Sequence, residues 1–136
     1  MSGDSVASGL ARADANLAAG EFALAYLGYA RIIAEAQDML PVTTIASAWV
    51  GMGLATRGCP HLAAGDSPGG LAYYQAALVI DPDCSDAWLA IANEFGDHPA
   101  FHTNRDWYEK AKSWILDHKH VFHDNWKYVS DLLDQS

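Results

Sequence analysis

Histidine and aspartate side chains gather near the C-terminal end of the chain, where together they could bind a metal ion. His118, His120 and His123 lie close together in the sequence, with Asp117 and Asp124 beside them. Imidazole and carboxylate groups are ligands that zinc and nickel accept. Their spacing fits no compact metal-binding motif, and the three histidines span an expected helix–loop junction. We therefore predict no bound metal or other cofactor, and keep a metal-responsive protein only as a third alternative.

The sequence also lacks the common motifs of catalytic sites. It contains no Gly-x-Ser-x-Gly segment, no phosphate-binding glycine loop followed by lysine and no His-Glu-x-x-His pair. Glu94 and Asp97 could form a carboxylate pair, but helix capping or solvation explains them more simply. Cys59 and Cys84 match no metal or redox spacing and are expected to be free thiols. We predict that the protein is not an enzyme.

The acidic charge of the chain restricts its partners. The formal net charge is −9, from 8 lysines and arginines against 17 aspartates and glutamates. Arg57 is the only lysine or arginine between Pro41 and Ala100. Binding of phosphates requires clustered lysine and arginine, so we predict no nucleic-acid partner. The charge suits a neutral to basic protein surface, although solubility alone would explain it equally well.

Composition indicates one globular domain outside the membrane. The chain is 51% hydrophobic and 18% charged, and 136 residues are enough for a single core. No stretch approaches the roughly 20 apolar residues of a membrane span. The first residues are polar and acidic, without the pattern of a signal peptide. We predict no membrane insertion and a cytoplasmic location.

Apolar residues recur at spacings of three and four, and no alternating strand pattern is present, so we predict an all-α fold with about seven helices. Gly20, Pro41 and Pro82 are expected to separate helices, and the glycine- and proline-rich segment 57–70 is expected to be a loop. Thr43 or Thr44 would cap the third helix, and Ser67-Pro68 would begin the fourth. The expected helices are about 4–19, 21–38, one from 43 or 44 that carries Trp49, 68–80, 85–96, 104–117 and 121–133.

Three tryptophans recur about every 38 residues in similar segments. Trp49, Trp88 and Trp126 are each followed by an apolar residue three positions on and by a Gly, Ala or Ser four positions on. Residues at these spacings share one face of a helix, and the small residue lets a second helix approach closely. Because one such unit cannot bury its apolar face alone, the recurrence predicts stacked helix pairs.

The region 71–97 resembles a junction between two tetratricopeptide repeats. The stretch 74–82 is similar to the second helix of a repeat with its terminal proline, and 85–95 to the first helix of the next. Trp88 precedes Tyr108 by 20 residues and follows Tyr74 by 14, which together give the 34-residue unit of that family. The longer spacing from Tyr29 to Trp49 is expected to lengthen the second helix.

This resemblance implies a right-handed α-solenoid of antiparallel helix pairs. Residues 1–136 would form a single domain, with repeats at about 4–40, 43–82 and 83–117 and a capping helix at 121–134. The first helices of successive repeats would line a concave groove that binds a peptide or helix with an apolar anchor and a lysine or arginine. The groove positions implied here are Ser47, Val50, Leu54, Asp86, Leu89, Asn93, Asp124, Lys127 and Asp131.

The resemblance therefore implies a protein–protein interaction module that serves as an adaptor, scaffold or assembly factor. One subgroup of the family binds the carboxylate of chaperone tails through cationic and amide side chains. Asp14, Gly51, Asp86 and Ala90 stand at those positions here, so we predict no chaperone-tail binding. Self-association through the ends of the solenoid, which would give a homo-oligomer, is the main alternative.

Overall fold

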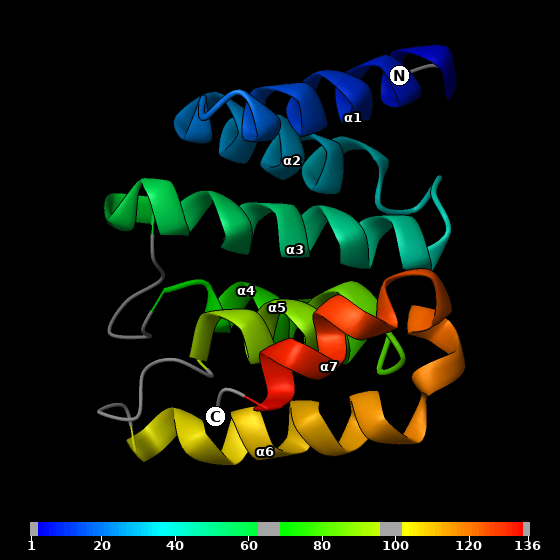
Figure 1. The fold of residues 1–136 in the computed structure, drawn as a ribbon. Coiled ribbons are helices and arrows are strands. Elements are labelled where there is room, and N and C mark those ends of the chain that lie inside the picture. The colour runs from blue at the N-terminus through cyan, green and yellow to red at the C-terminus, as the bar shows by residue number, and fades with distance from the viewer. Residues whose placement is uncertain (1–2, 63–68, 96–101, 135–136) are drawn as a thin grey trace. The chain divides into compact units, whose positions relative to one another are not determined.

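The computed structural model describes residues 3–62, 69–95 and 102–134, and helices joined by turns and short links make up this part of the chain (Figure 1). It contains seven α-helices, two short 3-10 helices and no strand, which confirms the predicted all-α fold. The α-helices are α1 (Gly3–Ala18), α2 (Phe22–Ala36), α3 (Val42–Gly58), α4 (Leu71–Ile80), α5 (Ser85–Phe95), α6 (His102–Asp117) and α7 (Trp126–Asp134). The 3-10 helices are η1 (Pro60–Leu62) and η2 (Lys119–Asn125).

The chain divides into two compact units, Met1–Cys84 with α1 to α4 and Ser85–Ser136 with α5 to α7. In the first unit each helix packs against the next, and α1 also contacts α3. In the second unit α6 packs against α5, and α7 contacts both α5 and η2. Within the described residues, no helix combines the length and the apolar character needed to cross a membrane.

Glycine and proline set the helix ends in the first unit. Gly20 has φ +80°, a conformation that glycine adopts without steric cost, and it separates α1 from α2 as predicted. Pro41 is the N-cap of α3, and its carbonyl accepts hydrogen bonds from the amides of Thr44 and Ile45. The expected capping by Thr43 or Thr44 is therefore wrong, because the helix begins before both residues, at Val42.

Two expected helix lengths in the first unit also differ from the structure. The helix α2 ends at Ala36, so the extra residues between Tyr29 and Trp49 form a turn before Pro41 and do not lengthen the helix. The helix α4 begins at Leu71, three residues later than expected, with Gly70 as its N-cap. The expected Ser67-Pro68 start lies outside the described residues. Helix α3 runs to Gly58 and η1 follows it, so the segment predicted as a loop is helical at its beginning.

The predicted seventh α-helix over 121–133 is correct only in its second part. Residues 119–125 form η2, and Phe122 within it has non-helical angles of φ −105° and ψ 22°. The ring of Phe122 is buried and contacts Trp114 edge-on, with ring centroids 6.1 Å apart. This packing places the chain in the tighter helix until Trp126, which begins α7 and does not lie in its middle.

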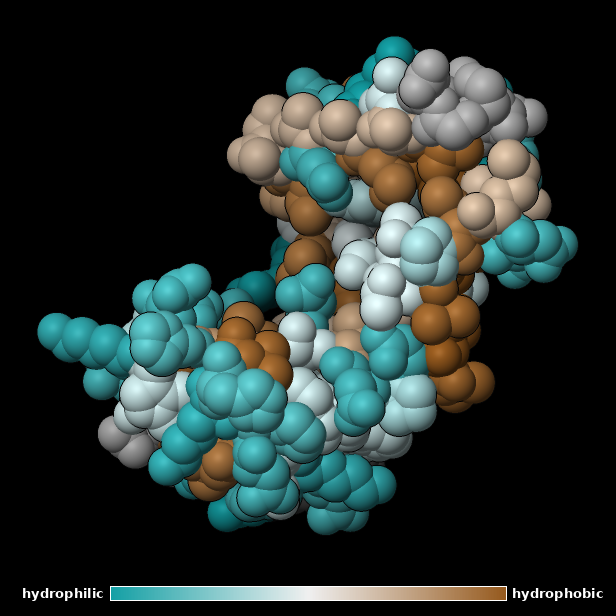
Figure 2. Space-filling model, turned by 90° about the vertical axis from the view of Figure 1, so that its right-hand side faces the viewer, coloured by the Kyte–Doolittle hydropathy of each residue, from teal (hydrophilic) through white to brown (hydrophobic). Residues whose placement is uncertain are grey.

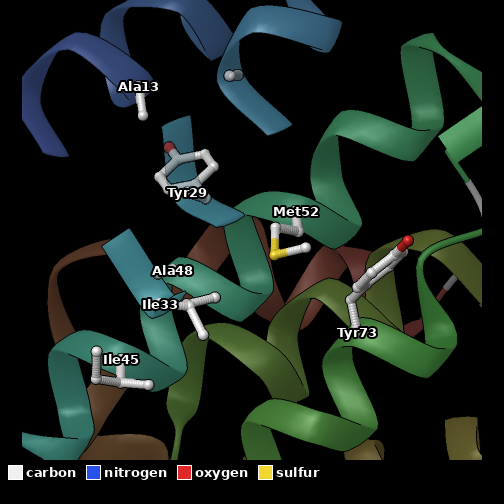
Figure 3. Packing of buried hydrophobic residues seen from close by; sticks show 8 residues of the cluster. Ala13, Tyr29, Ile33, Ile45, Ala48, Met52 and Tyr73 are labelled. Atoms are coloured by element: carbon white, nitrogen blue, oxygen red, sulfur yellow. The ribbon is translucent and has the colours of Figure 1, made fainter. Parts of the chain in front are cut away.

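The core of the first unit joins side chains from all four of its α-helices (Figure 3). Tyr29 from α2 and Met52 from α3 are buried there, and the half-buried Trp49 stacks on Tyr73 of α4 with ring centroids 6.3 Å apart. A Cβ atom on Gly53 would lie 2.4 Å from the ring of Tyr74. The small residue four positions after Trp49 therefore permits the close approach of α4 that the sequence predicted.

Several large hydrophobic side chains remain exposed at the surface. Figure 2 shows hydrophobic residues among hydrophilic ones on the face drawn there. Leu24 and Leu27 on α2 are 53% and 62% exposed. Both come from a helix whose other side is buried in the core, so α2 has apolar side chains on two sides.

Candidate functional site

A pocket lies between α1 and α3 in the first unit, and we call it the α1–α3 pocket. Its volume is about 270 Å³. Its lining comes from Leu10 and Asp14 on α1, Tyr29 on α2, and Thr43, Thr44, Ser47 and Ala48 on α3. These two helices are the first helices of the first two expected repeats, and Ser47 is one of the predicted groove residues.

Tyr29 connects the three helices around this pocket. Its ring is buried and its hydroxyl group donates a hydrogen bond to the carboxylate of Asp14. Figure 3 shows the hydroxyl directed toward the helix that carries Ala13. A Cβ atom on Gly51 would lie 2.4 Å from Cε2 of Tyr29, so the ring occupies space that only a glycine at this position of α3 leaves open.

The same environment keeps the Tyr29 phenol protonated. Burial, followed by the hydrogen bond and negative charge of Asp14, raises the pKa of Tyr29 well above its ordinary value. Because the phenol remains a donor, it orients Asp14, which is itself exposed at the rim. The pocket thus presents one fixed carboxylate to solvent.

The remaining lining residues determine what this pocket can bind. The side chain of Leu10 is apolar, and Thr43, Thr44 and Ser47 carry hydroxyl groups that can donate or accept hydrogen bonds. Asp14 can accept a charge-assisted hydrogen bond from a lysine or arginine. This chemistry suits a short peptide segment with one apolar and one basic side chain.

The predicted groove residues divide between the two units. On α3, Ser47 is exposed and lines the pocket, Leu54 is half-buried, and Val50 is only 3% exposed. A side chain as buried as that of Val50 offers little surface to a ligand. In the second unit Asp86, Leu89 and Asn93 lie along α5, Asp124 lies in η2, and Lys127 and Asp131 lie on α7.

These second-unit residues differ in their exposure. Asp86 is exposed, while Leu89 and Asn93 are half-buried. They stand three and four residues apart and therefore share one side of α5. Asp124, Lys127 and Asp131 are exposed. Asp124 lies outside the helix in which it was expected, and its carboxylate is 3.3 Å from Nδ1 of His123.

The C-terminal histidines have separate environments. The His118 ring stacks on Trp114 with centroids 3.9 Å apart, and its Nδ1 lies 2.7 Å from the Trp114 carbonyl oxygen. The ring centroids of His118 and His120 are 6.1 Å apart, while His123 contacts Asp124. Among the residues that the structure describes, no group of three or more His, Cys, Asp or Glu side chains could hold a metal ion. Packing on Trp114 accounts for the position of His118.

A row of stacked rings in the second unit was not predicted. Trp88 on α5 lies between Trp107 and Trp114 of α6, at centroid distances of 6.3 Å and 6.2 Å. His118 extends the row beyond Trp114, and the ammonium group of Lys110 lies 4.5 Å from the Trp107 ring. The spacing of seven residues between Trp107 and Trp114 places both rings on one side of α6, and the sequence could have predicted the stack from this spacing. This row holds α5 and α6 together.

A second tyrosine fixes the segment after α3. The hydroxyl group of Tyr73 donates to the Leu62 carbonyl oxygen and lies 3.1 Å from the Tyr26 hydroxyl. Burial and the hydrogen bond with Tyr26 raise the pKa of Tyr73 to about 12. Tyr73 therefore holds η1 against α4 and α2.

The predicted groove residues included none from the first helix of the chain. Leu10 was missed, and Asp14 was considered only as a position where a chaperone-tail binder would carry a cationic or amide side chain. Comparison of the chain with family models, with curated proteins and with solved structures finds no match. The resemblance to tetratricopeptide repeats is therefore based on the sequence pattern alone. The α1–α3 pocket is a candidate site because of the structure of the first unit.

Proposed function

We propose that this protein is a non-catalytic interaction module, an adaptor, scaffold or assembly factor, that binds a peptide or helix of another protein. The architecture we propose for it is a right-handed solenoid of antiparallel helix pairs of tetratricopeptide type. The order of helix packing in the first unit supports this architecture, because α1, α2, α3 and α4 pack consecutively and α1 also contacts α3. Repeats of paired helices bring alternate helices together in this way.

The observation that carries the proposal is the α1–α3 pocket. It lies between the first helices of two expected repeats and has an exposed carboxylate on its rim. Tyr29 holds this carboxylate through a hydrogen bond from a buried phenol, so Asp14 is oriented before any ligand arrives. A group that is already oriented loses less entropy on binding.

The chemistry of the pocket defines the ligand that we propose. A large apolar side chain would pack against the half-buried Leu10, and a lysine or arginine next to it would pair with Asp14. The hydroxyl groups on α3 would bind the peptide backbone. The overall charge of −9 favours the approach of such a basic segment.

Selection from a random peptide library against the whole protein tests this proposal. We expect enrichment of peptides that carry a lysine or arginine near a large apolar residue. Their binding should be lost in Ser47→Arg, which places a bulky cation in the pocket. It should persist in Ala23→Arg, an equal change at an exposed position of α2 that lines no pocket described here. A selection that gives no basic peptide sensitive to Ser47→Arg would refute the proposal.

A further inference from the structure

A larger crevice lies along the outer side of the first helix pair, and we call it the α1–α2 crevice. Its volume is about 640 Å³. Ser8, Arg12 and Asn16 flank it on α1, and Leu24, Leu27 and Arg31 flank it on α2. Residues spaced by three or four along each helix share one side, so the crevice has one polar wall and one largely apolar wall.

Small residues form the crevice where the two helices cross. A Cβ atom on Gly28 would lie 3.1 Å from Cβ of Ala13, and one on Gly9 would lie 3.5 Å from Ile32. These two contacts also show that α1 and α2 are antiparallel. Because the helices approach closely at small residues, the longer side chains on each side stand above the crossing and leave space between them.

The apolar wall is accessible to solvent. Leu24 and Leu27 are 53% and 62% exposed, although neighbouring residues of the same helix, such as Ala25 and Tyr29, are buried in the core. Two exposed leucines beside a crevice of this volume favour an apolar ligand, because covering them removes apolar surface from water.

The charge of the crevice is opposite to that of the chain. Arg12 and Arg31 line it together, and no Asp or Glu is part of its lining. The whole sequence holds 8 lysines and arginines against 17 aspartates and glutamates. Within the described residues Arg12 has no ion pair, while Arg31 contacts Glu35 at 3.2 Å. Both side chains of that pair are exposed, Arg31 to 72% and Glu35 to 44%, and such pairs contribute little stability, so Arg31 can exchange Glu35 for another carboxylate.

We propose that the α1–α2 crevice binds an acidic amphipathic helix of a partner protein. Its apolar side chains would cover Leu24 and Leu27, and its Asp or Glu side chains would pair with the two arginines. Gly28 lies opposite Ala13 and Ile32 opposite Gly9, so Arg12 is level with Tyr29, and Arg31 follows two residues later, about 3 Å along the helix axis. Because the two arginines project from opposite walls, two carboxylates three or four residues apart on one face of a bound helix can each reach one of them.

This surface is separate from the α1–α3 pocket and requires a ligand of the opposite charge. The inference therefore goes beyond the proposed function and does not rest on it. Binding at the crevice should be unaffected by Ser47→Arg, so the two proposals can fail independently.

The test uses two synthetic helical peptides and the full chain. One alanine-based peptide carries two leucines and two glutamates on one face, each pair spaced by one turn, and the other carries lysines in place of the glutamates. Fluorescence anisotropy should show saturable binding of the glutamate peptide only. In Arg12→Glu/Arg31→Glu the affinity for the glutamate peptide should fall roughly tenfold or more, since like charges then face each other.

Matched variants separate a local effect from a change in net charge. Arg57→Glu/Arg105→Glu alters the net charge equally at exposed positions outside the crevice, and Arg105 has the same spacing to Glu109 as Arg31 has to Glu35. This variant should bind the glutamate peptide like the wild type. Leu27→Asp should lose binding while circular dichroism shows an intact helical fold.

Three results would overturn the proposal. Equal binding of both peptides would show that the arginines do not select an acidic ligand. Equal losses of affinity in the two double variants would show that the glutamate peptide does not bind at the crevice. A concentration-dependent dimer that Leu27→Asp dissociates would instead assign the crevice to a second copy of this chain.

Discussion

The hydroxyl group of Tyr29, on α2, donates a hydrogen bond to the carboxylate of Asp14, on α1. The ring of the same tyrosine lies against Gly51 of α3, where a Cβ atom would collide with it. One buried side chain thus connects three helices and orients the charged group at the rim of the α1–α3 pocket. Changes at these positions should alter stability and binding together.

The space around two helical glycines predicts opposite effects of their substitution by alanine. Gly51→Ala should lower the free energy of unfolding by about 1–3 kcal/mol, because its Cβ would lie 2.4 Å from the buried ring. Gly9→Ala should raise it by about 0.5–1 kcal/mol, because that Cβ would meet Ile32 at an ordinary 3.5 Å and alanine favours the helix. Urea denaturation of both variants would show this difference. Equal changes would contradict the packing at Gly51.

Removal of the Tyr29 hydroxyl group should weaken the unit while preserving its shape. We expect Tyr29→Phe to lower the free energy of unfolding by about 1 kcal/mol at neutral pH, the typical net contribution of one hydrogen bond. The ring would still fill the space over Gly51, so circular dichroism should be unchanged. A variant as stable as the wild type would show that the bond to Asp14 contributes nothing.

The raised pKa values of Tyr29 and Tyr73 predict loss of stability in alkali. The folded state holds both phenolic protons more tightly than the unfolded chain, whose tyrosines have the ordinary pKa of about 10. The stabilisation is therefore complete below pH 10 and is lost as the pH rises toward the folded pKa, which is about 12 for Tyr73. Each phenol reduces the free energy of unfolding by at most about 1.4 kcal/mol per pH unit.

Ultraviolet absorbance of tyrosinate, recorded with circular dichroism, would measure this effect. Tyr29 and Tyr73 should ionise only above their ordinary pH range, in a step that accompanies unfolding. The variant Tyr73→Phe should lose part of the alkaline decrease in stability. Ionisation of all tyrosines near pH 10 in a fully helical protein would disprove the burial of both phenols.

The stacked rings of the second unit predict that Trp88 is important for its stability. Trp88→Ala should cost about 3 kcal/mol, the low end of the range for such truncations, because the ring is half-buried between Trp107 and Trp114. Leu116→Ala, on the exposed side of α6, should stay within about 0.5 kcal/mol of the wild type. Thermal unfolding followed by near-ultraviolet circular dichroism would compare them. Similar losses of thermal stability in both variants would show that the stacked rings do not stabilise the second unit.

The sequence predicted the helices better than their ends. Apolar spacing identified the seven α-helices found among the described residues, the last of them only in its second part, and Gly20 and Pro41 separate helices as expected. The start of α3 was misplaced because Pro41 itself serves as the N-cap, which polar capping rules do not anticipate. The 3-10 segment η2 was missed because it depends on contact between Phe122 and Trp114, and local propensity carries no information about such a contact.

The candidate site could be predicted only in part. Ser47 followed from the register of the expected repeats and lines the α1–α3 pocket. Val50 follows Ser47 by three residues and was expected on the same side of α3, but it is buried, because its exposure depends on the helices packed against it. The bond from Tyr29 to Asp14 joins residues 15 positions apart and requires the crossing of α1 and α2. A helical pattern marks Tyr29 as a core residue and gives no sign of its hydroxyl partner.

The most direct measurement of the proposed function compares a selected basic peptide with its Lys→Gln analogue by isothermal titration calorimetry. Each peptide is titrated into the wild type and into Asp14→Asn, whose amide oxygen can still accept the hydrogen bond from Tyr29. We predict that Asp14→Asn binds the basic peptide roughly tenfold more weakly, the loss expected for one charge-assisted hydrogen bond. The glutamine analogue should bind both proteins equally. An unchanged affinity of the basic peptide for Asp14→Asn would contradict peptide binding at the α1–α3 pocket.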